Sequence, residues 1–173
     1  MPLTDSQVGM IGEHLLCAYL VQGSDGSLDV FRPSVDDDHR DLAVGRRGGI
    51  PTAYMQVKTS RGPDARGRIL AAARWPKDAV YEHPAYLYAV LVVPRVAITC
   101  SWLVPSPDFN RLAYHEAAGP AHVRLIMEAY VEREDRWAPF RLPPPDLGSR
   151  LLERLDSLAS ANLRLTRPPR PPW

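Results

Sequence analysis

Four polar side chains, Glu13, Asp41, Gln56 and Lys58, have types and spacings that could assemble a hydrolytic site. Gln56 and Lys58 lie two residues apart in the segment YMQVKTS. Side chains two apart on a strand share a face and stand about 7 Å from each other. Asp41 lies 15 residues before Gln56, which is enough for an antiparallel hairpin that returns Gln56 beside Asp41. A carboxylate, an amide oxygen and an ammonium group could then converge.

These side chains need a helix and a hairpin to position them. Thr4 and Gln7 fit a capping box, and apolar residues follow at helical spacing, so a helix that carries Glu13 is expected from Thr4 to about Gly23. The turn-rich segment GRRGGIP favours a hairpin loop between two strands. Strands are expected over residues 28–32, 41–44 and 53–59.

The rest of the chain predicts more strands and two helices. Segments 85–93 and 96–104 are rich in valine and aromatic residues, which is typical of central strands, and Pro94-Arg95 joins them. Ser106-Pro107-Asp108 indicates an N-cap followed by a short helix to about His115. Leucines at intervals of three or four predict an amphipathic last helix that packs on the sheet. Further strands are expected over 68–72 and 122–130, so the fold class is α/β or α+β.

The sequence resembles the PD-(D/E)XK nuclease superfamily. The matching segments are GEHLLCAYL, DDDHRDLAV and YMQVKTS, which carry a helix glutamate, a strand aspartate and a Gln-x-Lys pair. The glutamine form is similar to the branch that contains methylation-dependent restriction endonucleases and related uncharacterised bacterial families. The later segments WLVPSPDF and DRWAPFRL are similar to those families as well. The resemblance implies an α/β restriction-endonuclease-like core, with a mixed central sheet flanked by an N-terminal and a C-terminal helix.

The resemblance also implies a mechanism, the hydrolysis of DNA phosphodiester bonds with Mg²⁺, for which Mn²⁺ can substitute. Asp41, the side-chain carbonyl of Gln56 and the backbone carbonyl of Val57 would hold the ion, which prefers oxygen ligands. Lys58 would position the attacking water or stabilise charge on phosphorus, and Glu13 would hold a metal-bound water or bind Lys58. A glutamine supplies a dipole instead of a charge, so affinity for the metal is expected to be weak before DNA arrives. Additional charge could come from Asp36, Asp37 or Asp38, although these three also fit a solvated turn.

Ordinary structural roles remain open for these residues. Glu13 could be an exposed helix residue, Asp41 could close a turn, and Lys58 could end an edge strand with its charge in solvent. The alternative function is therefore a catalytically inactive module with the nuclease fold that binds nucleic acid or a protein partner. Hydrolysis of RNA or a nucleotide is a third reading.

A basic segment follows the acidic one. Residues 25–41 are acidic and residues 46–77 are basic, which suits a metal site flanked by side chains that contact phosphates. A solvated loop would explain the same charges. The residues expected to contact nucleic acid are Arg46, Arg47, Arg61, Arg66 and Arg68.

Composition bounds the remaining possibilities. The chain has 173 residues, 45% of them hydrophobic, and a net charge of +1, so it can bury a sizeable core and carries no overall field for nucleic acid or membrane. Cys17 and Cys100 lie in apolar runs, which favours reduced core thiols. Without a leader or a long apolar run, we expect a cytoplasmic protein that has no organic cofactor, does not bind membranes and is by analogy a homodimer. We expect one domain over residues 1–165 and a flexible proline-rich tail over 166–173.

Overall fold

The structure is a computed structural model that describes residues 2–33, 39–50 and 52–163. Its largest element is a six-stranded mixed sheet with the order β1-β2-β3-β5-β6-β9, in which β3 and β5 run parallel and all other neighbours run antiparallel. The proline-rich tail over 166–173 and the three aspartates of 36–38 lie outside the described residues. The strands are β1 (Leu28–Phe31), β2 (Leu42–Arg46), β3 (Ala53–Ser60), β5 (Tyr86–Val92), β6 (Cys100–Pro105) and β9 (Arg141–Leu142).

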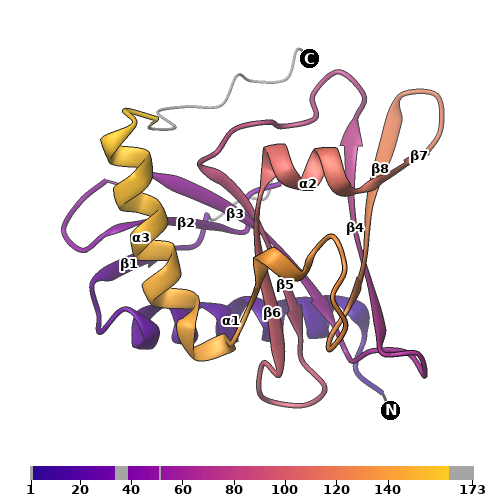
Figure 1. The fold of residues 1–173 in the computed structure, drawn as a ribbon, viewed down its shortest axis with the longest axis horizontal. Coiled ribbons are helices and arrows are strands. Elements are labelled where there is room, and N and C mark those ends of the chain that lie inside the picture. The colour runs from indigo at the N-terminus through magenta and orange to yellow at the C-terminus, as the bar shows by residue number, and fades with distance from the viewer. Residues whose placement is uncertain (1, 34–38, 51, 164–173) are drawn as a thin grey trace.

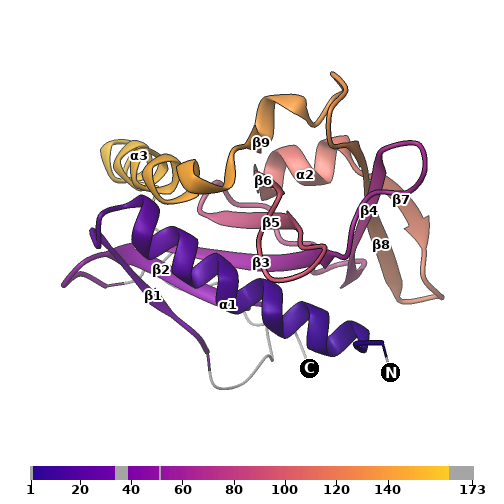
Figure 2. The same cartoon turned by 90° about the horizontal axis from the view of Figure 1, so that it is seen from below.

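Two helices cover one face of this sheet. Helix α1 (Asp5–Gly23) begins after the predicted capping box at Thr4, and α3 (Leu147–Ser160) is the predicted amphipathic helix. Leucines of both helices pack in one core with alternate residues of β3 and β5. Figure 1 shows the two helices with the sheet, and Figure 2 shows α1 lying along it. A mixed sheet flanked by an N-terminal and a C-terminal helix is the predicted fold class.

The opposite face packs against a second, three-stranded sheet. This sheet has the order β4-β8-β7, and its strands are β4 (Arg68–Pro76), β8 (His122–Tyr130) and β7 (Tyr114–Ala117). Helix α2 (Ser106–Leu112) and Trp137 complete this core. The remaining elements are two short 3-10 helices, η1 (Ala138–Phe140) and η2 (Pro144–Asp146).

Several sequence-based boundaries are wrong. The strand expected over 96–104 begins only at Cys100, because the chain turns back after β5: the Thr99 N–H donates to the Val92 carbonyl, and Val96 is 83% exposed. Ser106 is not the N-cap, because its hydroxyl instead bonds to both backbone groups of His83. The helix ends at Leu112, since the chain continues into β7, a strand that the sequence did not indicate.

Two further expectations need revision, those for the strand over 68–72 and for the burial of the cysteines. The strand expected over 68–72 continues to Pro76. Cys17 and Cys100 are free thiols, as expected, but they are only partly buried. Among the described residues, the structure contains no helix that is long and apolar enough to span a membrane.

The two helices cross where neither has a side chain. A Cβ atom on Gly148 would lie 2.4 Å from the backbone carbon of Gly23 and 2.5 Å from the Leu20 carbonyl oxygen. Backbone atoms cannot give way as the tip of a flexible side chain can, so the glycine sets the distance between α1 and α3. This packing fixes α1, and with it Glu13, relative to the sheet.

We therefore expect Gly148→Ala to lower the free energy of unfolding by about 2 to 3 kcal/mol, the cost of overpacking a tight contact. Gly9→Ala is the matched control, because a Cβ there meets nothing within 4 Å. It should stabilise the chain by about 0.5 to 1 kcal/mol through helix propensity. Urea denaturation measures both values, and equal effects of the two substitutions would contradict the close crossing.

Candidate active site

Strand β3 carries the candidate residues between the two cores. Met55 and Val57 point into the core beneath α1 and α3. Gln56 alternates with them and is paired in register with Tyr88 of β5, which belongs to the opposite core. Lys58 follows two residues later and is partly buried. Gln56 and Lys58 therefore share the face of the sheet that packs against the second sheet.

Asp41 lies at the point where β2 begins beside β3. Its N–H donates to the Met55 carbonyl at 2.9 Å, and its Oδ2 accepts the Val57 N–H at 2.6 Å. The pairing of Leu42 with Met55, continued by one residue, sets Asp41 opposite Gln56. The hairpin therefore returns Gln56 beside Asp41, the juxtaposition that the spacing of the two residues predicted.

The two residues before Asp41 are anchored to aromatic rings. His39 adopts a positive φ of 54°. Its ring centroid lies 4.7 Å from that of Trp75, and its carbonyl accepts a hydrogen bond from the Tyr86 hydroxyl. The Arg40 guanidinium lies over the Tyr54 ring, 4.9 Å from its centroid. These contacts fix the backbone that leads into Asp41.

Helix α1 packs on the other face of β3 from Gln56 and Lys58, and it brings Glu13 within electrostatic reach of Asp41. Gly12 lets the helix approach β3 closely, since a Cβ there would lie 2.0 Å from Thr59 Oγ1. Burial raises the pKa of Glu13 above its ordinary value, and the negative charge of Asp41 raises it further. The Asp41 charge therefore acts on the Glu13 carboxyl through space.

Arg32 is a component of the site that sequence reasoning missed. Its Nη2 lies 2.6 Å from Glu13 Oε2, and this ion pair lowers the pKa of Glu13 in opposition to burial. Its Nη1 lies 2.9 Å from His14 Nε2, while His14 Nδ1 lies 2.7 Å from the Met10 carbonyl. A carbonyl can only accept, so Nδ1 is the donor and Nε2 accepts from Arg32. Arg32 lies just after β1, and no sequence signal marked it as facing the helix.

The oxygen atoms near Asp41 fit a hard divalent cation. Gln56 Oε1 is buried and has no hydrogen-bond partner within the described residues, an arrangement that costs free energy unless a ligand satisfies it. The Val57 N–H points toward Asp41, and the carbonyl of a strand residue points to the same side as its N–H. Asp41, Gln56 and Val57 thus supply carboxylate, amide and backbone oxygens, the ligands that Mg²⁺ takes. Over residues 2–33, 39–50 and 52–163, no three His, Cys, Asp or Glu residues form a metal-binding group.

The five predicted nucleic-acid contacts fall into two groups. Arg46 and Arg47 lie at the far end of β2, about 17 Å along the strand from Asp41. Arg46 forms a bidentate ion pair with Asp156 of α3, and Arg47 is exposed.

The second group follows the end of β3 closest to Lys58. Arg61 pairs with Asp5 at 2.8 Å, and Arg68 pairs with Asp64 at 3.0 Å. Arg66 is exposed, and its N–H donates to the Asp64 carboxylate. The structure thus brings Arg61, Arg66 and Arg68 near one end of the candidate site and sets Arg46 and Arg47 apart from it.

The fold described above is shared with an endonuclease. The solved structure of a bacterial homing endonuclease, I-Ssp6803I, matches 94% of this chain and 98% of its own chain, with a TM-score of 0.56 and 17% sequence identity. No family model and no curated protein matches the sequence. At this level of identity the likeness shows that the two chains share a fold, and it says nothing about the chemistry of this one.

The two charges beside Glu13 make its titration a test of the site. Because the pKa of Glu13 is raised in the folded chain, its protonated form stabilises the fold. This contribution to stability is complete below the pKa of glutamate in the unfolded chain and is lost as the pH rises through the raised pKa. Arg32→Gln should raise the pKa of Glu13 further, and Asp41→Asn should lower it. Carbon-13 NMR of the carboxyl groups measures both midpoints, and Asp156→Asn is a distant control that should leave Glu13 unchanged. An unaltered midpoint in Asp41→Asn would contradict the proximity of the two carboxylates.

Proposed function

We propose that this protein is a metal-dependent endonuclease that hydrolyses DNA phosphodiester bonds through Glu13, Asp41, Gln56 and Lys58. The observation that carries the proposal is the position of Asp41, whose carboxylate accepts the Val57 N–H opposite Gln56 and whose charge raises the pKa of Glu13. The shared fold with a homing endonuclease supports it. We place the chain in the PD-(D/E)XK superfamily, in its Gln-x-Lys branch, as a cytoplasmic enzyme.

Asp41, the Gln56 side-chain carbonyl and the Val57 carbonyl would hold Mg²⁺, with Mn²⁺ as a substitute. The bound ion would supply positive charge to the phosphate and lower the pKa of a bound water. With one carboxylate and two neutral oxygens, this ligand set binds the cation weakly by itself. A DNA phosphate adds negative charge, so metal and DNA should bind cooperatively.

Lys58 and Glu13 act on the other reacting groups. The Lys58 ammonium, on the same face of β3 as Gln56, stabilises negative charge on the phosphate oxygens or orients the attacking water. Glu13 has a pKa shifted toward neutrality by burial and by Asp41, which suits a carboxylate that accepts a proton from water. Arg32 holds the Glu13 carboxylate in place.

DNA would approach from the end of β3 that Lys58 shares with Arg61, Arg66 and Arg68. Exchange of their carboxylate partners for phosphates costs little, because surface ion pairs contribute about 0 to 1 kcal/mol each. Arg46 and Arg47 lie farther away and would contact only a longer duplex. A homodimer would place two such sites to cut both strands.

The alternative is a catalytically inactive nuclease fold that binds nucleic acid or a protein partner. Gln56 favours it, because a neutral amide stands where a carboxylate would hold the metal more firmly. The small number of acidic ligands around Asp41 within the described residues points in the same direction. Cleavage and binding must therefore be measured on the same samples.

The test is cleavage of labelled single-stranded, duplex, nicked, branched and methylated DNA and of RNA, with Mg²⁺, with Mn²⁺ and with EDTA. We expect metal-dependent cutting of DNA that falls at least about 100-fold in Asp41→Asn and in Lys58→Met, the loss typical of a removed charge-stabilising group. Glu116→Gln and Arg111→Met are the controls, because both residues are exposed and lie on β7 and α2, outside the candidate site and the basic segment. Equal activity in all four variants would contradict the proposed site.

Gln56→Glu separates the two functions. In an enzyme, the added carboxylate should lower the Mg²⁺ concentration for half-maximal cleavage by about tenfold, because it adds a charged oxygen ligand. DNA that is bound but never cut, by the natural chain or by Gln56→Glu, would instead establish the binding module.

A further inference from the structure

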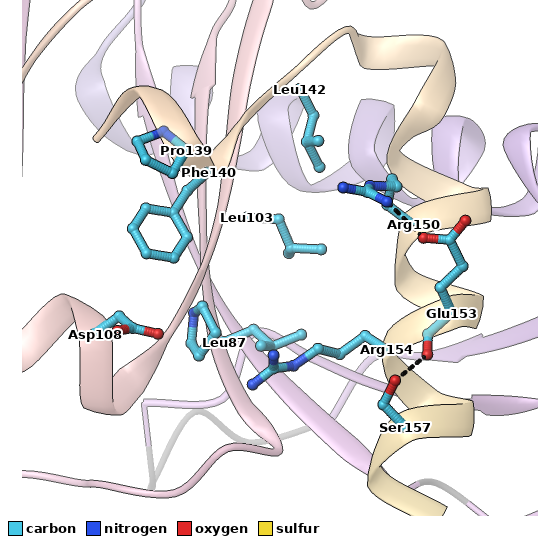
Figure 3. A pocket seen from close by; sticks show the side chains of 11 residues that line it. Leu87, Leu103, Asp108, Pro139, Phe140, Leu142, Arg150, Glu153, Arg154 and Ser157 are labelled. Atoms are coloured by element: carbon cyan, nitrogen blue, oxygen red, sulfur yellow. Dashed lines mark hydrogen bonds and ion pairs between the residues drawn. The ribbon is translucent and has the colours of Figure 1, made fainter. Parts of the chain in front are cut away.

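A cavity with polar and apolar walls lies away from Asp41. It encloses about 270 Å³ between α3, the β5–β6 pair, α2 and η1. Figure 3 shows Leu103, Phe140 and Leu142 around it, with Arg154 reaching from α3 toward Leu87. None of the residues proposed for DNA cleavage lines this cavity, so its role is independent of the proposed function.

Most charges in the lining are already paired. Arg150 bonds to Glu153 at 2.7 Å, and Asp108 bonds to Arg111 at 2.9 Å. Arg154 differs, because it forms no ion pair with any carboxylate of the described residues. The cavity thus contains one positive charge that lacks a paired counterion.

Arg154 also has spare hydrogen-bonding capacity. Its Nη2 donates to the Pro84 carbonyl at 3.1 Å, whereas its Nε is buried and has no partner in the described part of the chain. Burial lowers the pKa of Arg154, with partial compensation from Asp108. A guanidinium presents five N–H donors in a planar fork that matches a carboxylate, so an anion here would recover the interactions that burial removed.

We propose that this cavity binds a small monocarboxylate with an apolar body, held by Arg154 at the carboxylate and by Leu103, Phe140 and Leu142 around the rest. A single carboxylate would give Arg154 the ion-pair partner that Asp108, which is bonded to Arg111, does not provide. A doubly charged phosphate would meet repulsion from Asp108 and Glu153, which also line the cavity. The apolar residues of the wall favour an anion that has a hydrophobic part over one that has none.

The experiment is a titration of the full chain with 3-phenylpropionate, followed by amide NMR shifts. 3-Phenylpropionamide is the uncharged control, and inorganic phosphate is the control for the anion alone. N-Acetyl-Leu-Phe, with a free carboxylate, tests whether the source is a peptide C-terminus instead of a small acid. The variants are Arg154→Met, which retains the length of the side chain, and Arg95→Gln, which removes an exposed arginine that does not line the cavity.

We expect 3-phenylpropionate to shift amides of α3 and η1, with affinity at least tenfold weaker in Arg154→Met and nearly unchanged in Arg95→Gln. The amide and phosphate should bind at least tenfold more weakly than the acid. Arg154→Lys should restore part of the affinity, which guards against misfolding of Arg154→Met. The proposal would be overturned by equal binding of the acid and the amide, by equal affinity in Arg154→Met, by tighter binding of phosphate, or by no shift in the natural chain. Tighter binding of the peptide would mean that the ligand is a peptide C-terminus and not a small acid.

Discussion

The hydrogen bond from the Val57 N–H to the Asp41 carboxylate is the contact on which the site depends. Strand β2 pairs with β3 only as far as Met55, whereas β3 continues to Ser60 beside β5. Backbone groups of β3 beyond that point need another partner, since buried N–H groups are almost always bonded. The Asp41 side chain supplies an acceptor at Val57. The same carboxylate therefore extends the hydrogen bonding between the two strands past their last paired residues.

The two faces of strand β3 pack against different cores and carry different kinds of residue. Met55 and Val57 are buried beneath α1 and α3, so the position of β3 along its own axis is fixed by packing. Gln56 is only 3% exposed, and its unbonded Oε1 reduces stability. Glu13 likewise has a pKa raised by burial. Gln56 lies opposite Asp41 in the register of β2 and β3, and the Asp41 charge raises the pKa of Glu13, so two groups that burial disfavours are both linked to Asp41.

The sequence predicted the parts of the fold that depend on local patterns. The capping box at Thr4 and the GRRGGIP hairpin are short-range features, and both occur where expected. The spacing of Asp41 and Gln56 likewise predicted their pairing, because a hairpin register depends on the turn between the strands. Their catalytic roles remain a proposal.

Features that depend on distant contacts were beyond the sequence. Strand β7 is exposed along its length and exists because it pairs with β8, so its own residues carry no alternating pattern. The Ser106 hydroxyl prefers His83 to a helix cap, and Arg32 reaches Glu13 across 19 positions of sequence. Arg154 differs from its neighbours only in the folded chain, where Arg150 is paired with Glu153 and Asp108 is paired with Arg111. Charge balance in a cavity is a property of the folded chain.

The metal site proposed at Asp41 is tested most directly by mapping Mn²⁺ binding through the paramagnetic broadening of amide NMR signals, with and without a DNA duplex. We expect substoichiometric Mn²⁺ to broaden the amides of Asp41, Gln56, Val57 and Glu13 first, and more strongly when DNA is present. Asp41→Asn should abolish this local effect. Broadening centred on another part of the chain, or the same pattern in Asp41→Asn, would contradict the proposed metal site.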